Sequence, residues 1–267
     1  MPGYSRLSIR ASSPVARVRL LCVMLLAVPC ATLAAAEPAY VETGSVAAAE
    51  ATQAAAADEQ FLYAISSTQV AKYDRRSGER LALSTGKASH LNSGYFWEGK
   101  LYCAHSNFPK TPAQSELMQL DPATMQLSTY KDFGAAYGSL TWAIRKENRW
   151  YCNFAHYGKE NHKSVLVAFD NEWNELASWT YPAELVADLD NYSLSGGIWK
   201  GDTLIATGHH ARKLYHLSLP EEGKVLRLDA VLPGPFPGQG IATDPLSGEL
   251  IGIDRPQKRI VFAKLRD

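Results

Sequence analysis

The chain has 267 residues, a formal net charge of zero and 46% hydrophobic residues. This length accommodates one large β domain, and the hydrophobic content, with 6 Trp and 13 Tyr, suffices for a sizeable core. The balanced charge excludes the strongly basic surface with which proteins hold nucleic acid or anionic membranes, so we expect neither as a partner.

The first 36 residues have the pattern of a secretory signal peptide. Four arginines precede an apolar stretch, Leu20 to Leu33, and residues 34–36 offer small side chains for cleavage before Glu37. A membrane anchor is the alternative, but the stretch is shorter than the ~20 residues of a spanning helix. We therefore expect residues 1–36 to be removed and the mature protein, with no integral membrane span, to be periplasmic or secreted.

Residues 37–57 consist mostly of Ala, Glu and Thr. They show no strand pattern and no large hydrophobe after Val46, which predicts an Ala-rich linker. The folded domain is therefore expected to occupy residues 58–267.

Within this domain, short β-type runs alternate with turns at a nearly constant pitch. A turn near an acidic residue recurs at Asp74, Asp121, Asp170 and, as a variant, near Leu219. A strand that follows a polar turn recurs at Leu101, Trp150, Leu204 and Leu250. Both markers repeat about every 48 residues, which is the length of a four-stranded propeller blade.

The repeat predicts an all-β fold, a single β-propeller with five blades. The first unit, residues 61–84, lacks an obvious innermost strand, and the last, residues 238–265, lacks an outermost one. We therefore expect the chain ends to cooperate in closing the ring, which removes free sheet edges. A β-sandwich is the structural alternative, but it does not explain the repeat. We expect the propeller to be a monomer.

Propeller geometry assigns each loop to one face of the ring. The connections that enter the innermost strands share a face with those between the second and third strands. Six of the seven histidines are expected on that face: His90, His105, His156, His162, His209 and His210. The seventh, His216, falls inside a strand. Since propellers bind ligands at a mouth of the central channel, this face is the predicted functional one.

The side chains of this face favour acid–base chemistry on a small polar ligand. The candidate catalytic residues are His90, His105, His156, His209 and Arg255, and the candidate substrate-binding residues are Asn92, Asn107 and Asp254. Histidine titrates near neutrality, and Arg255 can hold a carboxylate by two hydrogen bonds. We expect no cofactor, because no closely spaced ligand motif supports the alternative of a shared metal ion. Each histidine could instead simply cap a loop.

The domain contains two cysteines, Cys103 and Cys152. They occupy the same position in the second strands of neighbouring blades, where side chains point in the same direction around the ring. A disulfide requires Cα atoms within roughly 7 Å of each other. We therefore expect buried, unbridged thiols that behave as small hydrophobes.

Several motifs together resemble bacterial exported β-propeller proteins of the cycloisomerase-like or uncharacterised type. They are SHLNSG, GKLYCAHSN, DPATMQL, YGSLTW, TGHH with KLYHLSLP, and GQGIA followed by LIGIDR. The resemblance covers residues 58–267 and implies an exported propeller. The family carries TGHD where this chain has TGHH, so any role of that Asp is in doubt at His210. By analogy with propellers that close muconates into lactones, Arg255 would hold a carboxylate and a histidine would deliver a proton.

Two functions follow from this pattern. The favoured one is an exported propeller that acts on a small polar, carboxylated substrate by acid–base chemistry, of isomerase (cycloisomerase) or lactonase type. The alternative is a non-catalytic propeller that binds a carbohydrate or an envelope protein through aromatic side chains such as Trp97, Trp142, Trp173 and Trp199. Because fold does not fix function, the site must decide between them.

Overall fold

The computed structural model describes residues 1–3, 8 and 37–266. Residues 37–267 belong to one compact unit. The predicted signal peptide lies almost entirely outside the described residues and stays a prediction. No helix within the described part of the chain has the length and apolar character needed to cross a bilayer.

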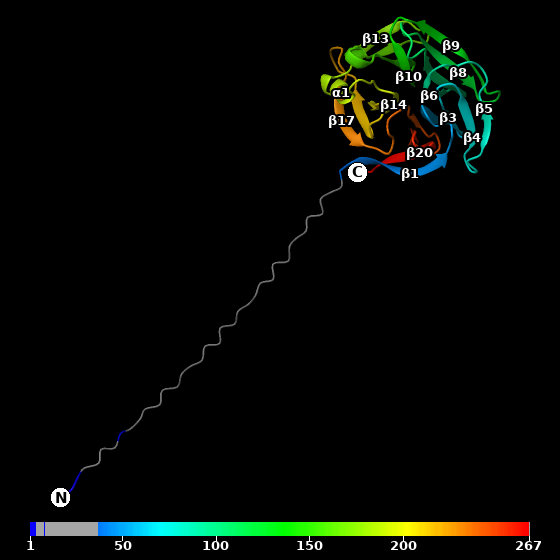
Figure 1. Ribbon diagram of the computed structural model, residues 1–267. Helices are drawn as coiled ribbons and strands as arrows, with labels where there is room; N and C mark the ends of the chain where they lie inside the picture. The colour runs from blue at the N-terminus through cyan, green and yellow to red at the C-terminus, as the bar shows by residue number, and fades with distance from the viewer. Residues whose placement is uncertain (4–7, 9–36, 267) are drawn as a thin grey trace. The chain divides into compact units, whose positions relative to one another are not determined.

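Five four-stranded antiparallel sheets form a ring, as Figure 1 shows. The first blade contains β2 (Ala54–Ala57), β3 (Phe61–Ile65), β4 (Val70–Asp74) and β5 (Arg80–Leu83). The second contains β6 (Leu91–Trp97), β7 (Lys100–Ser106), β8 (Ser115–Asp121) and β9 (Gln126–Gly134). The third contains β10 (Ser139–Lys146), β11 (Arg149–Ala155), β12 (Val165–Phe169) and β13 (Glu175–Thr180). The predicted five-bladed propeller is confirmed.

The two remaining blades complete the ring. The fourth contains β14 (Gly196–Lys200), β15 (Thr203–Thr207), β16 (Lys213–Ser218) and β17 (Arg227–Pro233). The fifth contains β18 (Ala242–Thr243), β19 (Leu250–Asp254), β20 (Arg259–Arg266) and, as its outermost strand, β1 (Ala39–Ala47). A 3-10 turn, η1 (Gly158–Lys163), and a helix, α1 (Ala183–Asp188), lie in loops.

The ring is closed by strands from opposite ends of the chain. In Figure 1, β1 runs beside β20, and their register extends from Ala39 opposite Arg266 to Ala47 opposite Arg259. The hydroxyl of Tyr40 on β1 also lies 3.1 Å from Nε2 of His216 in the fourth blade. The predicted closure by the chain ends is confirmed, and His216 lies inside a strand as expected.

The prediction of a linker at residues 37–57 is wrong. This segment supplies the two strands that the sequence repeat lacks: β1, outermost in the fifth blade, and β2, innermost in the first. The four alanines of β2 are all buried, because the propeller axis leaves no room for larger side chains there. A Cβ added to Gly240 would lie 2.6 Å from Cβ of Ala54. A strand made only of alanine has little hydrophobic bulk, so its sequence resembles that of a linker.

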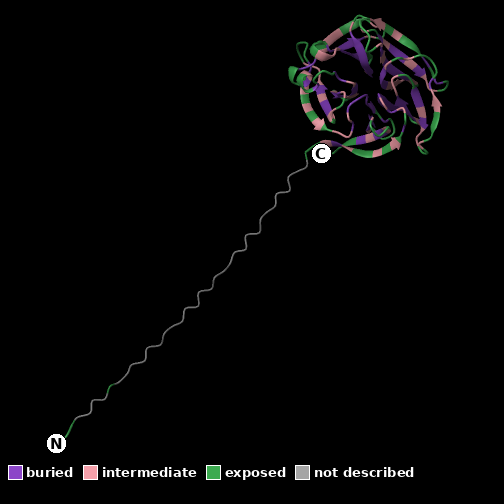
Figure 2. Cartoon of the chain, in the orientation of Figure 1, coloured by how far each residue is buried: buried purple, intermediate pink, exposed green. Residues whose placement is uncertain are grey.

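The hydrophobic core lies between the blades. Each of its five clusters combines residues of neighbouring sheets, such as Trp142 and Tyr151 of the third blade with Leu204 and Tyr215 of the fourth. Figure 2 shows buried segments toward the inside of the ring and exposed ones in the loops. Cys103 and Cys152 are buried in two of these clusters and are not bridged, as predicted.

Candidate functional site

A pocket lies where the innermost strands begin, on the face predicted to be functional. Its volume is about 180 Å³, and all five blades contribute to it. It is lined by Gln53, His90, Asn92, Phe108, Thr141, Tyr157, Asn191, Tyr192, Ser195, His209, Gln239 and Arg255. We call it the histidine mouth. The structure thus brings together four of the predicted site residues: His90, Asn92, His209 and Arg255.

Arg255 is a half-buried cation in this pocket. It directly follows β19, and its Nε donates a hydrogen bond to the Thr52 carbonyl, at 2.5 Å. This contact fixes the guanidinium against the first blade. Among the described residues, no carboxylate lies within 4 Å of it, and burial lowers its pKa. A partly desolvated, unpaired guanidinium favours an anion in the pocket, because the anion would compensate its charge.

The loop carrying His209 is held by the loop that precedes β18. Nε2 of Gln239 donates to the His209 carbonyl at 2.6 Å, and the Gln239 N–H donates to the Gly208 carbonyl at 2.9 Å. Gly238 has φ +81°, and a Cβ there would lie 2.4 Å from the His209 carbonyl carbon, so only glycine fits. Gln239 itself has φ 76°, an uncommon backbone conformation of the kind found at functional sites.

Aromatic side chains flank the imidazoles of His209 and His90. The Tyr192 ring stacks on His209, with centroids 4.2 Å apart and planes 10° apart. On the other side, the Phe108 ring lies 5.2 Å from that of His90 and 5.1 Å from that of Tyr157. These rings restrict the imidazoles. Nδ1 of His209 lies 3.4 Å from Nδ1 of His210, so its Nε2 is the nitrogen left for a ligand.

The electrostatics of the mouth keep both imidazoles neutral near pH 7. Burial, followed by the charges of Arg255, His210 and His90, lowers the pKa of His209 to about 4. Burial likewise lowers the pKa of His90, followed by the charges of His105 and Arg255. A neutral imidazole can accept a proton, and a bound anion would raise both pKa values by offsetting the charge of Arg255.

Two polar residues of the mouth also join neighbouring blades. Nδ2 of Asn92 donates to the Leu140 carbonyl at 3.0 Å, and the Thr141 hydroxyl donates to the Leu194 carbonyl at 2.8 Å. The Asn92 carboxamide oxygen is the part of that side chain left for a ligand. We therefore expect Asn92 to support both the ring and the predicted site.

The other predicted site residues do not line the histidine mouth. His105 is engaged by Glu116, with 3.2 Å between Nδ1 and the carboxylate, and accepts the Ser89 N–H at its Nε2. The Nε2 of His156 lies 3.1 Å from the Tyr137 carbonyl, beside a separate surface pocket.

Asn107 and Asp254 have structural partners as well. Asn107 bonds within its own loop, to Pro112 and Gln114. Asp254 is buried, and its carboxylate lies 3.3 Å from the guanidinium of Arg259 and 3.7 Å from that of Arg212. These contacts indicate that Asn107 and Asp254 stabilise loops and do not contact a ligand in the histidine mouth.

The sequence reasoning missed several residues of the mouth. Gln53 lies in the segment predicted to be a linker, and Gln239 lies between two glycines, Gly238 and Gly240. Tyr192 and Asn191 lie in the long connection between β13 and β14, which also carries α1. The length of this connection, compared with its counterparts in the other blades, was the signal that could have identified them. Within the described residues, no three His, Cys, Asp or Glu side chains gather as metal ligands would.

Comparison with known proteins adds information on the fold. The structure resembles the glutaminyl cyclase of Myxococcus xanthus with a TM-score of 0.58 and 9% identity, covering 85% of this chain and 97% of that one. The likeness establishes the fold alone. The extracellular domain of a one-component system from B. thetaiotaomicron is less similar, with a TM-score of 0.43 and 11% identity over 74% of this chain and 24% of that one. No family model and no curated protein matches the sequence.

Proposed function

We propose that the histidine mouth binds a small carboxylated substrate and transforms it by proton transfer. One observation carries this proposal: His90, His209 and Arg255, from three different blades, line one small pocket that contains no carboxylate. Such a set of nitrogen groups attracts an anion and can exchange protons with it. A pocket of about 180 Å³ is small for a ligand site and favours a compact substrate.

Each residue has a defined role in this proposal. Arg255 holds the substrate carboxylate, and the anion raises the pKa of the neighbouring imidazoles so that one of them takes up a proton from solvent. In a cycloisomerisation, a substrate carboxylate oxygen forms a C–O bond to one carbon of a double bond. The π electrons move to the other carbon, which takes the proton from the imidazolium. The imidazole is then neutral again, and atoms and charge balance.

A lactonase-type reaction uses the same groups. A neutral imidazole of His209 or His90 takes a proton from water as the water oxygen attacks the lactone carbonyl, and the proton is then given to the leaving alkoxide. The glutaminyl cyclase from M. xanthus is, by its name, a cyclase, and its fold is therefore compatible with cyclising chemistry. That likeness establishes the fold alone and leaves the reaction and the substrate to the experiment. Export remains part of the proposal on the strength of the N-terminal sequence.

A non-catalytic glycan-binding propeller is the second candidate. The side chains of Phe108 and Tyr192 at the histidine mouth are 42% and 36% exposed, which is the exposure that stacking on a sugar ring requires. This candidate predicts that Phe108→Ala and Tyr192→Ala weaken glycan binding, while His209→Asn does not.

A substrate screen tests the leading proposal. The purified protein is incubated with lactones and unsaturated dicarboxylic acids, and product formation is followed by NMR. We expect turnover of at least one compound by the wild-type protein and its loss in His209→Asn. The matched control is His162→Asn, because His162 lies on the same face but is exposed in η1. No turnover across both substrate classes, together with glycan binding that survives His209→Asn, would favour the binding propeller instead.

A further inference from the structure

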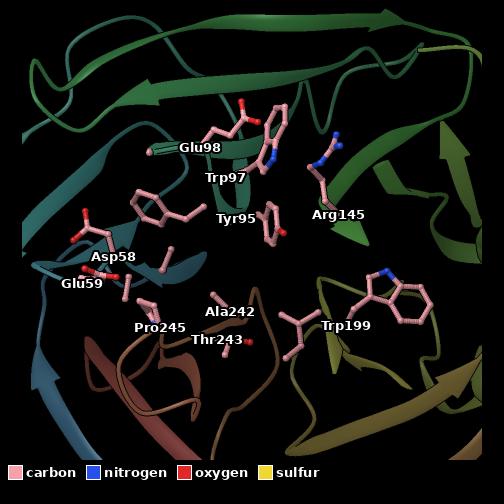
Figure 3. Close-up of a pocket in the computed structure, with 15 residues that line it drawn as sticks. Asp58, Glu59, Tyr95, Trp97, Glu98, Arg145, Trp199, Ala242, Thr243 and Pro245 are labelled. Atoms are coloured by element: carbon pink, nitrogen blue, oxygen red, sulfur yellow. The ribbon is translucent and has the colours of Figure 1, made fainter. Parts of the chain in front are cut away.

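The opposite mouth of the channel contains a second pocket. Its volume is about 470 Å³, and it lies where the innermost strands end, as Figure 3 shows. Its main walls are Tyr95, Phe96 and Trp97 from β6 and Ile198 and Trp199 from β14. We call it the aromatic mouth. It shares no lining residue with the histidine mouth.

Close packing of the innermost strands separates the two mouths. A Cβ at Gly196 would lie 2.7 Å from the Ile241 nitrogen and 2.8 Å from the Gln239 carbonyl oxygen. The backbone at Gly240 meets Ala54 in an isolated parallel bridge. Backbones in contact at this level leave no room for a ligand to pass, so the aromatic mouth is a site in its own right.

The cations near this mouth contact protein groups. Arg145, 9% exposed as a residue, holds its guanidinium 4.1 Å above the Trp97 ring and donates from Nη2 to Asn171 Oδ1 at 2.8 Å, whereas its buried Nη1 has no hydrogen-bond partner among the described residues. Lys146 lies 4.8 Å above the Trp199 ring and pairs with Asp202 at 2.5 Å. Both tryptophans thus already hold a protein cation on one face, which shows that these ring faces favour positive charge.

Two glutamates at the rim of the aromatic mouth, by contrast, have carboxylates without a protein partner among the described residues. Among the described residues, neither Glu59 nor Glu98 has an ion pair or a side-chain hydrogen bond, and both side chains are exposed. Asp58, by contrast, bonds to its own turn and to the Tyr63 hydroxyl. Figure 3 shows Glu59 across the pocket from Arg145, whereas Glu98 lies beside Trp97, the ring that Arg145 covers.

We propose that the aromatic mouth binds a small organic cation, an amine carried on an apolar, preferably aromatic, body. The body would lie against Tyr95, Ile198 and Trp199, and the ammonium group would face Glu59 and Glu98. The apolar walls supply hydrophobic contact, and the acidic rim together with the ring faces selects positive charge. A carboxylated ligand would meet like charge at this rim, so the two mouths would take ligands of opposite sign.

Three aromatic probes of nearly equal size test this proposal: phenethylamine, 2-phenylethanol and 3-phenylpropionate. Each is titrated into the purified protein while tryptophan fluorescence and heat are recorded at low ionic strength. We expect the amine to bind about tenfold more tightly than the alcohol, and the carboxylate to bind most weakly in Arg255→Met, where the histidine mouth lacks its cation. Raising the salt concentration should narrow the difference between amine and alcohol, because salt screens the rim carboxylates.

Variants assign the binding to this mouth. Glu59→Gln combined with Glu98→Gln should reduce the affinity for the amine to that for the alcohol, with an unchanged thermal midpoint. Glu184→Gln, an exposed acid on α1 at the other face, is the matched control and should change nothing. Arg255→Met should also leave amine binding intact, so the result is independent of the histidine mouth. Equal affinity for amine and alcohol, or no amine binding up to about 10 mM, would overturn the proposal.

Discussion

The two mouths of the channel are built on the same five innermost strands and differ in almost every other respect. The histidine mouth is formed by long connections, such as the one between β13 and β14 that contains α1. The aromatic mouth is formed by strand ends and tight hairpin turns, such as Glu98 and Gly99 with φ 47° and 72°. Long loops allow titratable groups to converge, whereas tight turns leave the walls to the strand side chains. The two sites thus differ because the strands are joined by long connections at the histidine mouth and by short turns at the aromatic mouth.

The largest expected effect is on turnover, which the account assigns to the histidine mouth and not to the aromatic mouth. Replacing both His90 and His209 by Asn should lower turnover at the histidine mouth by about 10²–10⁴-fold, the usual contribution of general acid–base groups. Asn retains hydrogen-bonding capacity but cannot exchange protons near neutrality. Steady-state kinetics on a substrate found by the screen measures the change, with amine binding at the aromatic mouth as the control. Unchanged turnover would show that neither His90 nor His209 transfers a proton in the reaction.

The second prediction concerns the charge of the histidine mouth. Arg255→Met should weaken the binding of a small dianion such as maleate by about 10–150-fold, which corresponds to the 1.5–3 kcal/mol of a charge-assisted hydrogen bond. Calorimetry measures the affinity, and Arg149→Met, a change at an exposed hairpin position, is the matched control. If both variants weaken binding equally, the effect reflects overall charge and not the site.

The third prediction concerns the packed strands that separate the mouths. Gly196→Ala should lower the free energy of unfolding by about 1–3 kcal/mol, because the added methyl meets backbone atoms that cannot move independently. Gly44→Ala is the matched control, since a Cβ there meets nothing within 4 Å. Denaturant unfolding of the two variants measures the difference. Equal stability would show that the strands are less closely packed than described.

The last prediction concerns the pH dependence of stability. The pKa of His209 is about 4 in the folded protein, below its ordinary 6.5, so the unfolded chain binds the proton more tightly. The stability that His209 contributes is therefore complete above about pH 6.5 and is lost as the pH falls toward 4. His209→Asn should flatten this part of the profile of thermal midpoint against pH, and His162→Asn should not. Parallel profiles for all three proteins would contradict the pKa depression.

The sequence was sufficient to predict the propeller, the five blades and the closure by the chain ends. The turn markers and strand spacing come from local chemistry that every blade repeats. The strands β1 and β2 were missed because axial packing, and not local propensity, selects alanine at β2.

The site was predictable only in part. The face of each histidine follows from strand order, so His90 and His209 were placed on the face where the pocket lies. The distinction between these two and His105 or His156 depends on side-chain partners such as Glu116 and the Tyr137 carbonyl, which strand order does not reveal. The aromatic mouth was missed because it combines strand ends distant in the chain.

The most direct test of the central claim is a calorimetric comparison of fumarate, which is fully ionised at about pH 6, with its neutral diamide at that pH, in buffers of different ionisation enthalpy. The account predicts that fumarate binds the wild-type protein with net proton uptake, because the anion raises the pKa values of His90 and His209, and that the diamide binds at least tenfold more weakly. Equal binding of the two compounds, or fumarate binding without proton uptake, would contradict the claim that the histidine mouth is an anion site with coupled imidazoles.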